Sequence, residues 1–280
     1  MDNDDVMIGR VLTRREAVQL LGAVGLAALV GCGPEEEVAQ TAVSTPTQSV
    51  STAAANTAVP PTTTLPDPTA TLVEAAAHGN TVPTCVVRPA LTEGPYFVDE
   101  RLNRSDIRSD PTNGSVVDGA PLLLTFNVSQ ITAGGCTAFP SAIVDIWHCD
   151  ARGIYSDAND RSFNTVGQKF LRGYQETDAN GQAQFLTIYP GWYNGRAVHI
   201  HFKIRSSLDD AGVEFTSQLF FDEDYTDQVY QQEPYASTGQ RTILNSQDGI
   251  YQQSGGQLTL NVAEGSDGYV ASFDIGLDMT

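Results

Sequence analysis

Seven short apolar or alternating runs between residues 121 and 277 place the strongest limit on how this chain can fold. Clusters of Gly, Asn, Asp and Pro separate the runs, which is the pattern of β-strands joined by turns. Residues 224–237 suggest a short helical segment, with Tyr230 and Tyr235 packing inward. Seven strands with hardly any helical period predict an all-β domain, either a sandwich or a barrel. The runs are residues 121–131, 142–150, 182–190, 196–206, 214–222, 256–264 and 268–277.

The first 32 residues have the features of an export signal. Arg14 and Arg15 precede an apolar run from Ala17 to Val30, which is too short to span a bilayer as a stable helix. The paired arginines resemble a twin-arginine signal, and the LVGC stretch resembles a lipobox that would make Cys32 a lipidated N-terminal residue. An ordinary signal peptide that ends in a chance cysteine is the alternative. Residues 1–32 therefore predict an exported, extracytoplasmic protein, anchored to the bacterial cell membrane through a lipid on Cys32.

Residues 33–82 differ in composition from everything that follows them. They consist largely of Thr, Ala, Ser, Pro and Val, with no aromatic residue and no sustained period. Such a segment cannot bury enough surface to offset its chain entropy, so we predict a disordered tether. His78 lies in this segment and is not expected to bind a metal. The folded domain is then expected to span residues 83–280.

The formal net charge of −19 weighs against two classes of partner. Nucleic acids and anionic membrane surfaces are bound through clustered Lys and Arg, whereas this chain has 15 such residues against 34 Asp and Glu. We therefore expect no nucleic-acid partner, and no membrane contact other than the lipid anchor.

Three cysteines lie in the predicted domain, so at least one thiol has no partner within it. A strand separates Cys136 from Cys149 and would hold the two about 20 Å apart, which disfavours their pairing. We prefer a Cys85–Cys136 disulfide, with Cys149 as a small buried apolar residue. A Cys85–Cys149 disulfide stays open.

The stretch YPGWYNGRAVHIHFKI, residues 189–204, places two histidines one residue apart in a strand-like run. Residues i and i+2 of a strand point to the same face, so His199 and His201 converge while Val198, Ile200 and Phe202 face the core. The pair alone fits a solvated strand face as well as a metal site. The apolar alternation on the other face favours a strand with a buried side.

The other potential ligands near these histidines are tyrosines, Tyr155 and Tyr193, each close to a strand end. The chain has no H-E-x-x-H motif and no paired C-x₂-C spacing, so zinc is poorly supported. A free phenol is a poor ligand, but a hard trivalent cation lowers its pKa enough to bind the phenolate. Two phenolates and two imidazoles therefore suit iron(III).

Four stretches resemble the intradiol ring-cleavage dioxygenases, the family of catechol, hydroxyquinol and protocatechuate dioxygenases, and especially its compact exported members. The motifs W-x₇-Y, P-G-x-Y and R-x₂-H-x-H occur in that order, and the combination is far more specific than any one of them. The resembling stretches are residues 91–110, 142–157, 170–204 and 216–221.

The resemblance implies one non-haem iron(III) per chain, with Tyr155, Tyr193, His199 and His201 as its ligands. It also implies a β-sandwich of mainly antiparallel strands with the metal at the strand ends. In the family's reaction the substrate displaces one phenolate, here Tyr193, which then takes a substrate proton.

The resemblance also implies a substrate pocket. Arg196 corresponds to the arginine that lies over the substrate ring, and Gln218 to a glutamine of the same pocket. Pro95 and Tyr96 correspond to the segment that lines the substrate mouth, although Tyr96 fits a packing role equally well. Trp147 and His148 face opposite sides of their strand by alternation, so we expect each to be a core or supporting residue rather than a ligand.

The implied activity is cleavage of a catechol-type ring by O₂ between its two hydroxyl-bearing carbons, giving a cis,cis-muconate-type diacid. The partners would be a small aromatic diol and O₂, with no flavin, nicotinamide or external reductant. No segment between Cys32 and Cys85 has a helical apolar stripe for dimerisation, so we expect a monomer. The alternatives are a zinc or copper enzyme with the same ligands, and an inactive module that binds aromatics or carbohydrate at the cell surface.

Overall fold

The computed structural model describes residues 85–209 and 212–279. The predicted signal with Cys32, the predicted tether and His78 all lie outside these residues. The proposed domain limits of 83–280 therefore stay a prediction. No helix within the described ranges is long and apolar enough to cross a membrane.

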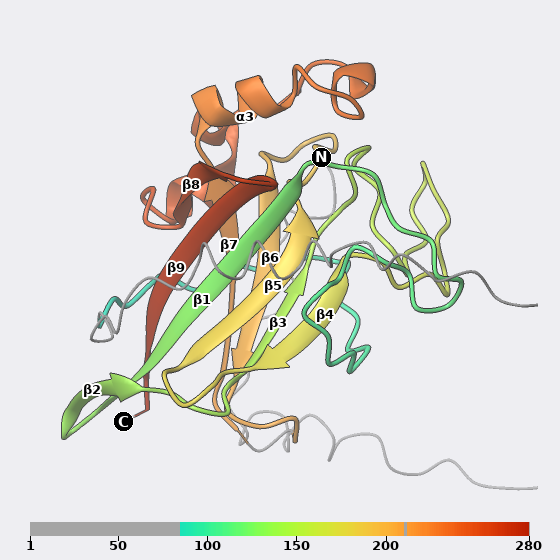
Figure 1. Cartoon of the computed structure of the whole chain (residues 1–280). Helices are drawn as coiled ribbons and strands as arrows, with labels where there is room; N and C mark the ends of the chain where they lie inside the picture. The colour runs from blue at the N-terminus through green and yellow to red at the C-terminus, as the bar shows by residue number, and fades with distance from the viewer. Residues whose placement is uncertain (1–84, 210–211, 280) are drawn as a thin grey trace, which may run out of the picture. The chain divides into compact units, whose positions relative to one another are not determined.

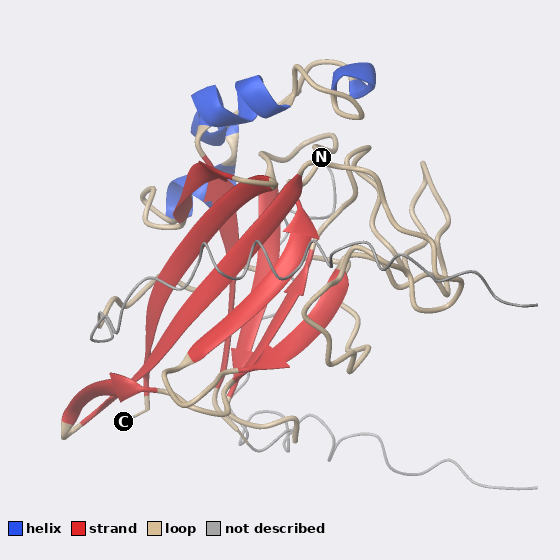
Figure 2. Ribbon diagram, viewed as in Figure 1, coloured by secondary structure: helices blue, strands red, loops and turns tan. Residues whose placement is uncertain are grey.

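The described residues form mainly strands, with a few short helices (Figures 1 and 2). The prediction of a β-rich domain is confirmed, because each of the seven predicted runs overlaps a strand. The strands are β1 (Pro121–Thr132), β2 (Gly135–Ala138), β3 (Ile143–Trp147), β4 (Arg172–Glu176), β5 (Gln182–Ile188), β6 (His199–Arg205), β7 (Glu214–Phe221), β8 (Thr259–Gly265) and β9 (Gly268–Asp278). The helices are α3 (Glu223–Val229), α4 (Gly249–Gln253) and the 3₁₀ turns η2 (Ala236–Thr238) and η3 (Asn245–Gln247).

These strands join into one curled, mixed sheet. Its order is β2-β1-β9-β8-β7-β6-β3-β4, and β5 pairs with β1 outside that path. Six of the pairings are antiparallel, whereas β1–β9 and β7–β8 are parallel. Figure 1 shows β1 beside β9, and β6 between β7 and β3. The structure therefore shows a mixed sheet in which antiparallel pairings predominate.

The core is built from aromatic and branched side chains that meet across the curl of the sheet. Phe126 of β1 lies against Phe185 of β5, Phe202 of β6 and Phe273 of β9, with ring centroids 5.4 to 6.1 Å apart. Edge-to-face and tilted pairs of this kind add to the free energy gained from burying apolar area. The contact between β1 and β6 fixes which face of β6 is turned to the core.

Strand β6 alternates as its sequence predicts, but both of its faces are buried. The face opposite Ile200 and Phe202 carries His199, His201, Lys203 and Arg205. The segment before β1 covers this face. Within that segment the Phe97 ring lies 4.6 Å from Lys203 Nζ, and Asp99 pairs with Arg205 at 3.3 Å. Buried polar groups require partners, which are either neighbouring protein groups or a bound ligand. This covered face is therefore a candidate ligand-binding site.

The predicted helical segment at 224–237 is confirmed as α3, which continues into η2 through a turn. The Asp222 side chain caps α3 by accepting a hydrogen bond from Tyr225 N. Tyr235 is fully buried and donates to Tyr189 O, and its ring stacks on Tyr230 at 5.1 Å. The short helix α4 was not predicted.

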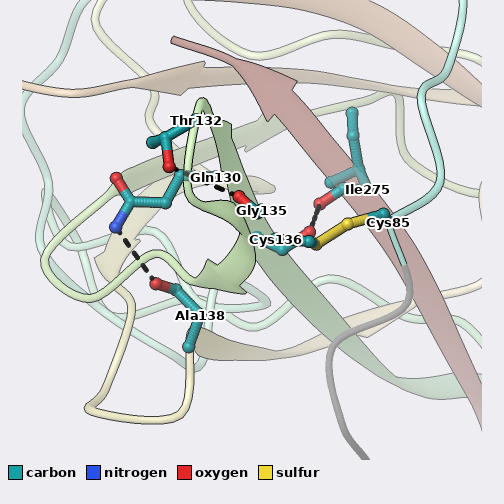
Figure 3. The surroundings of a disulfide bond; sticks show 8 residues. Cys85, Gln130, Thr132, Gly135, Cys136, Ala138 and Ile275 are labelled. Atoms are coloured by element: carbon teal, nitrogen blue, oxygen red, sulfur yellow. Dashed lines mark hydrogen bonds between the residues drawn. A yellow bond between two sulfur atoms is a disulfide. The ribbon is translucent and has the colours of Figure 1, made fainter.

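The structure contains one of the disulfide pairings that the sequence left open. Cys85 is bonded to Cys136, with their Cα atoms 5.9 Å apart (Figure 3). The bond fastens the start of the described segment to β2. Cys149 is a buried free thiol that donates to Gly191 O at 3.4 Å, as expected for the cysteine left over.

Candidate metal centre

Four side chains from separate parts of the sequence meet at one end of β6. His199 Nε2 and His201 Nε2 lie 3.0 Å apart, and Tyr155 Oη lies 3.4 Å from His199 Nε2. The ring centroid of Tyr193 is 5.7 Å from those of Tyr155 and His199. All four predicted metal ligands therefore lie in one cluster.

The cluster lies beside the start of β6 and the ends of β3 and β7. His199 is the first residue of β6 and pairs with Phe220 near the end of β7. His201 pairs with Trp147, the last residue of β3. Tyr155 follows β3 and Tyr193 precedes β6, so both loops emerge beside the histidines. Helix α3 follows β7 in the sequence and lies past the end of the sheet in Figure 1.

Two glycines let the loops that carry the tyrosines cross closely. Gly153 has φ +81°, and a Cβ there would lie 2.2 Å from Trp192 O. A Cβ on Gly191 would lie 2.4 Å from Asp150 O. Because neither site has room for a side chain, any larger residue would separate the loop of Tyr155 from the loop of Tyr193.

The two histidine rings are held by different contacts. His199 Nδ1 lies 2.7 Å from Ala197 O; since a carbonyl only accepts, Nδ1 carries the proton and Nε2 presents a lone pair. The His201 ring stacks on Trp147 at 5.0 Å, and a Cβ on Gly94 would lie 2.9 Å from His201 Cε1. Both rings are therefore fixed with Nε2 pointing into the cluster.

Burial sets the charge state of these groups in the metal-free chain. It lowers the pKa of both His199 and His201, and the positive charge of Arg196 adds to the effect. Both imidazoles are therefore neutral, which is the form that binds metals. Burial likewise raises the pKa of Tyr155, and the neighbouring Tyr193 raises it further. The phenolate would form only if a strong positive charge were bound in the cluster.

The donors of the cluster fit a hard trivalent cation. Among residues 85–209 and 212–279, no three His, Cys, Asp or Glu side chains converge in a way that could hold a metal ion. Only two members of the cluster are histidines, and its remaining donors are phenols. Two neutral nitrogens with a phenol oxygen beside them form a donor set for a hard cation that accepts phenolate.

The residues expected to bind substrate lie beside the cluster. Arg196 is buried, donating from Nε to Asp248 Oδ2 at 3.0 Å and from Nη2 to Gln218 Oε1 at 2.6 Å. Gln218 donates in turn to Thr92 O at 2.9 Å. Burial alone would lower the pKa of Arg196, but Tyr193 and Asp248 raise it above its ordinary value. Arg196 thus stays charged next to the tyrosines.

The segment with Pro95 and Tyr96, which precedes β1, contacts the same cluster. The Tyr96 ring stacks on Tyr155 at 4.4 Å and lies edge-on to Tyr193 at 6.2 Å. Its hydroxyl donates to Asp160 Oδ2 at 2.9 Å, and the neighbouring Pro95 is exposed. Tyr96 therefore packs on a candidate ligand and forms part of the wall of the cluster.

Trp147 and His148 point to opposite sides, as the alternation predicts. Trp147 supports the His201 ring, whereas His148 lies on the far face, bonded to Thr187 Oγ1 at 2.7 Å and to Cys149 O at 2.8 Å. Neither belongs to the four-residue cluster. The residue that sequence reasoning missed is Asp248, whose position before Gly249 could have suggested a helix cap but not a contact with Arg196.

Comparisons with known proteins agree with this geometry. A family model described as dioxygenase matches residues 92–278. The protocatechuate 3,4-dioxygenase β chain of Burkholderia cepacia is 30% identical over 155 residues, which cover 51% of this chain and 64% of that protein. A chlorocatechol 1,2-dioxygenase of Pseudomonas putida is 25% identical over 153 residues, 48% of this chain and 53% of that protein. The chain therefore spans less than two thirds of the length of these curated relatives.

The solved structures include a relative of similar extent. An intradiol ring-cleavage dioxygenase from Tetranychus urticae aligns with a TM-score of 0.59 and 30% identity, covering 69% of this chain and 95% of that chain. The family model covers most of the described residues, including all four side chains of the cluster. This chain belongs to the intradiol ring-cleavage dioxygenase family.

Proposed function

We propose that this chain is a non-haem iron(III) dioxygenase that cleaves the ring of a catechol-type aromatic between its two hydroxyl-bearing carbons, with O₂ as co-substrate. The product would be a cis,cis-muconate-type diacid. The observation that carries the proposal is the convergence of two neutral imidazoles and two phenols beside a buried, charged arginine. Membership in the family supports oxygenase chemistry, and the family uses non-haem iron(III).

Tyr155, Tyr193, His199 and His201 would hold one iron(III) per chain. When bound, the ion supplies Lewis acidity, which lowers the pKa of the phenols and of the substrate hydroxyls and prepares the aromatic ring for attack by O₂. The crossing of the loops at Gly153 and Gly191 sets where the two phenols lie before any metal binds.

The remaining steps depend on side chains of the chain itself. Tyr193 Oη would take a proton from a substrate hydroxyl as the substrate enters, because Tyr193 is half-buried whereas Tyr155 is fully buried. Arg196 would stabilise negative charge on the substrate ring, since its guanidinium is buried and held in place by Asp248 and Gln218. Tyr96 and Pro95 would shape the entrance, with Gln218 acting through Arg196.

The proposal includes the architecture and the cellular setting. The contact between Phe126 and Phe202 supports a two-layer sandwich, with β1, β5 and β9 on one side and β3, β6 and β7 on the other. The chain would act as a monomer outside the cytoplasm, tethered by residues 33–82 to a lipid on Cys32. Incorporation of a labelled fatty acid should be lost in Cys32→Ser, and undiminished labelling would contradict the anchor.

The colour of the purified chain and its oxygen uptake test the proposed reaction. Bound iron should give a burgundy colour through tyrosinate-to-iron charge transfer, and oxygen uptake with a panel of substituted catechols should yield products heavier by two oxygen atoms. Zinc or copper in place of iron would favour a different enzyme, and binding of aromatics or carbohydrate without turnover would favour an inactive module. A colourless chain that consumes no oxygen after iron loading would contradict the proposed function.

A further inference from the structure

One buried carboxylate outside the predicted site holds two parts of it together. Asp248 lies between η3 and α4, and its side chain is 1% exposed. Its Oδ1 accepts hydrogen bonds from Ile250 N at 2.8 Å and Tyr251 N at 3.0 Å. Its Oδ2 accepts from Arg196 Nε at 3.0 Å and Ala197 N at 2.8 Å. The carboxylate is thus fixed to a helix by one oxygen and to the segment before β6 by the other.

Asp248 Oδ2 is linked to the arginine directly and to the candidate metal ligand His199 through one residue. The peptide N–H of Ala197 is bound by Asp248, and the carbonyl of the same residue accepts from His199 Nδ1 at 2.7 Å. Asp248 therefore holds Arg196 directly and His199 through one backbone residue. Gln218 binds Arg196 at Nη2, so Nε and Nη2 are both occupied by protein groups. These two bonds leave the Nη1 hydrogens and the second Nη2 hydrogen, which would serve a substrate.

Stability alone is a weak explanation for this arrangement. Burying an ion pair costs desolvation energy that roughly offsets the attraction, and apolar replacements of similar volume are often no less stable. A fixed cation beside two phenols has a clearer use, because charge that develops on a substrate is stabilised only by groups already in position. The location of the pair, rather than its presence, is therefore informative.

We propose that Asp248 is a positioning residue for ring cleavage, which aims the Arg196 guanidinium and fixes the His199 ring. The inference rests on the proposed function. It assigns a role to the Asp248 cap of α4, which none of the short sequence motifs includes.

The first test is Asp248→Asn in the full chain loaded with iron. Asn has nearly the same shape, but its amide group would face N–H donors at one of the two oxygen positions. We expect the iron content to remain and kcat to fall about 10- to 100-fold, the usual range for groups that orient a metal ligand. Asp145→Asn is the matched control, because Asp145 is also buried and paired with an arginine of β6, Arg205, at 2.7 Å. Its kcat should stay within about twofold of the parent chain.

A double-mutant cycle separates positioning from general destabilisation. If Asp248 acts through Arg196, the chain with both Asp248→Asn and Arg196→Met should lose little more activity than Arg196→Met alone. Losses that multiply, or an equal loss in Asp145→Asn, would overturn the proposal. Unchanged kcat in Asp248→Asn would overturn it as well.

A readout that needs no activity uses the metal-free chain labelled with ¹⁵N. Asp248→Asn should shift the Arg196 Nε–H and His199 Nδ1–H resonances, whereas Asp145→Asn should leave both in place. Unshifted resonances in Asp248→Asn would contradict the positioning role whether or not the parent chain consumes oxygen. Absence of oxygen uptake by the iron-loaded parent chain would instead contradict the proposed function, so the two failures are distinguishable.

Discussion

The covered face of β6 has two halves that are satisfied in different ways. Toward the end of the strand, Lys203 pairs with Glu93 at 2.6 Å and with Glu214. At the start of the strand, among the residues that the structure describes, no carboxylate is bonded to His199 or His201, and His201 Nδ1 is buried without a hydrogen-bond partner. The half with Lys203 consists of charges that neutralise one another, whereas the half with the histidines gathers neutral imidazoles and phenols. A cluster of buried neutral donors differs in this way from a structural ion-pair network, and it is a candidate ligand site.

The two halves also differ in their buried Asp–Arg pairs, which are Asp145–Arg205 and Asp248–Arg196. Asp145 accepts one N–H bond, from Arg205, and burial raises its pKa to about 6. Asp248 is also buried, which would raise its pKa, but Arg196 and the backbone N–H groups of Ala197 and Tyr251 lower it below its ordinary value. The number of donors decides which carboxylate stays charged. Asp248 therefore keeps its charge to lower pH than Asp145, which takes up a proton as the pH falls through about 6.

The largest effect is expected from His201→Ala. Removing one of the two buried imidazoles should release most of the bound iron, because neutral nitrogens bind a metal without losing a proton and only one would remain. Metal analysis of the purified chain measures this. Lys203→Met, two residues further along the same face, is the control and should keep its iron. Equal iron loss in both variants would remove the distinction between the two halves.

Tyr193→Phe should give the next largest effect. The variant keeps both histidines and Tyr155, so we expect it to retain iron while its visible absorption band shifts. Turnover should slow by about 10²- to 10⁴-fold, the range for loss of a positioned proton acceptor. Absorption spectra and oxygen uptake report the two changes. A chain with unaltered colour and rate would show that Tyr193 is neither ligand nor base.

At the other half of the face, Arg205→Met should affect stability instead of activity. It leaves the Asp145 carboxylate buried without its partner, which typically costs about 3–5 kcal/mol. Chemical denaturation measures the free energy of unfolding. Iron content and kcat should be those of the parent chain below the unfolding transition. A fall in kcat without unfolding would mean that this half takes part in the reaction.

The smallest effect is a pH dependence from Asp145. Its folded pKa of about 6 lies above the ordinary value of 3.8, so the folded state binds the proton more tightly. Its contribution to stability is therefore present below pH ~4 and is lost as the pH rises toward ~6, by at most about 3 kcal/mol. The groups that face it are Asp99, Lys203, Arg205 and, across the β3–β4 pairing, Tyr174.

Unfolding curves of the parent chain and Asp145→Asn between pH 4 and pH 6.5 test this. The stability of the parent chain relative to the variant should decline across that window. Parallel curves would show that Asp145 does not titrate there and would remove the contrast with Asp248.

Most of the strands were predictable, and the exceptions have a physical reason. β2 is four residues long, and β4 has the sequence RGYQE, with a glycine and two charged residues. β4 is a strand because β3 pairs with it on one side and Asn103 bridges to Tyr174 on the other. Partners supplied by distant segments override a weak local preference for extended structure.

The sequence by itself determined the placement of His199 and His201 on one face, because side-chain alternation is a local property of an extended backbone. It also determined the family, through three short motifs in a set order. Only the tertiary structure decided that Tyr155 and Tyr193 reach those histidines, since that depends on the close crossing of two loops at Gly153 and Gly191. The pairing of Asp248 with Arg196 spans 52 residues. No local pattern encodes such a contact, because it follows from the path of the whole chain.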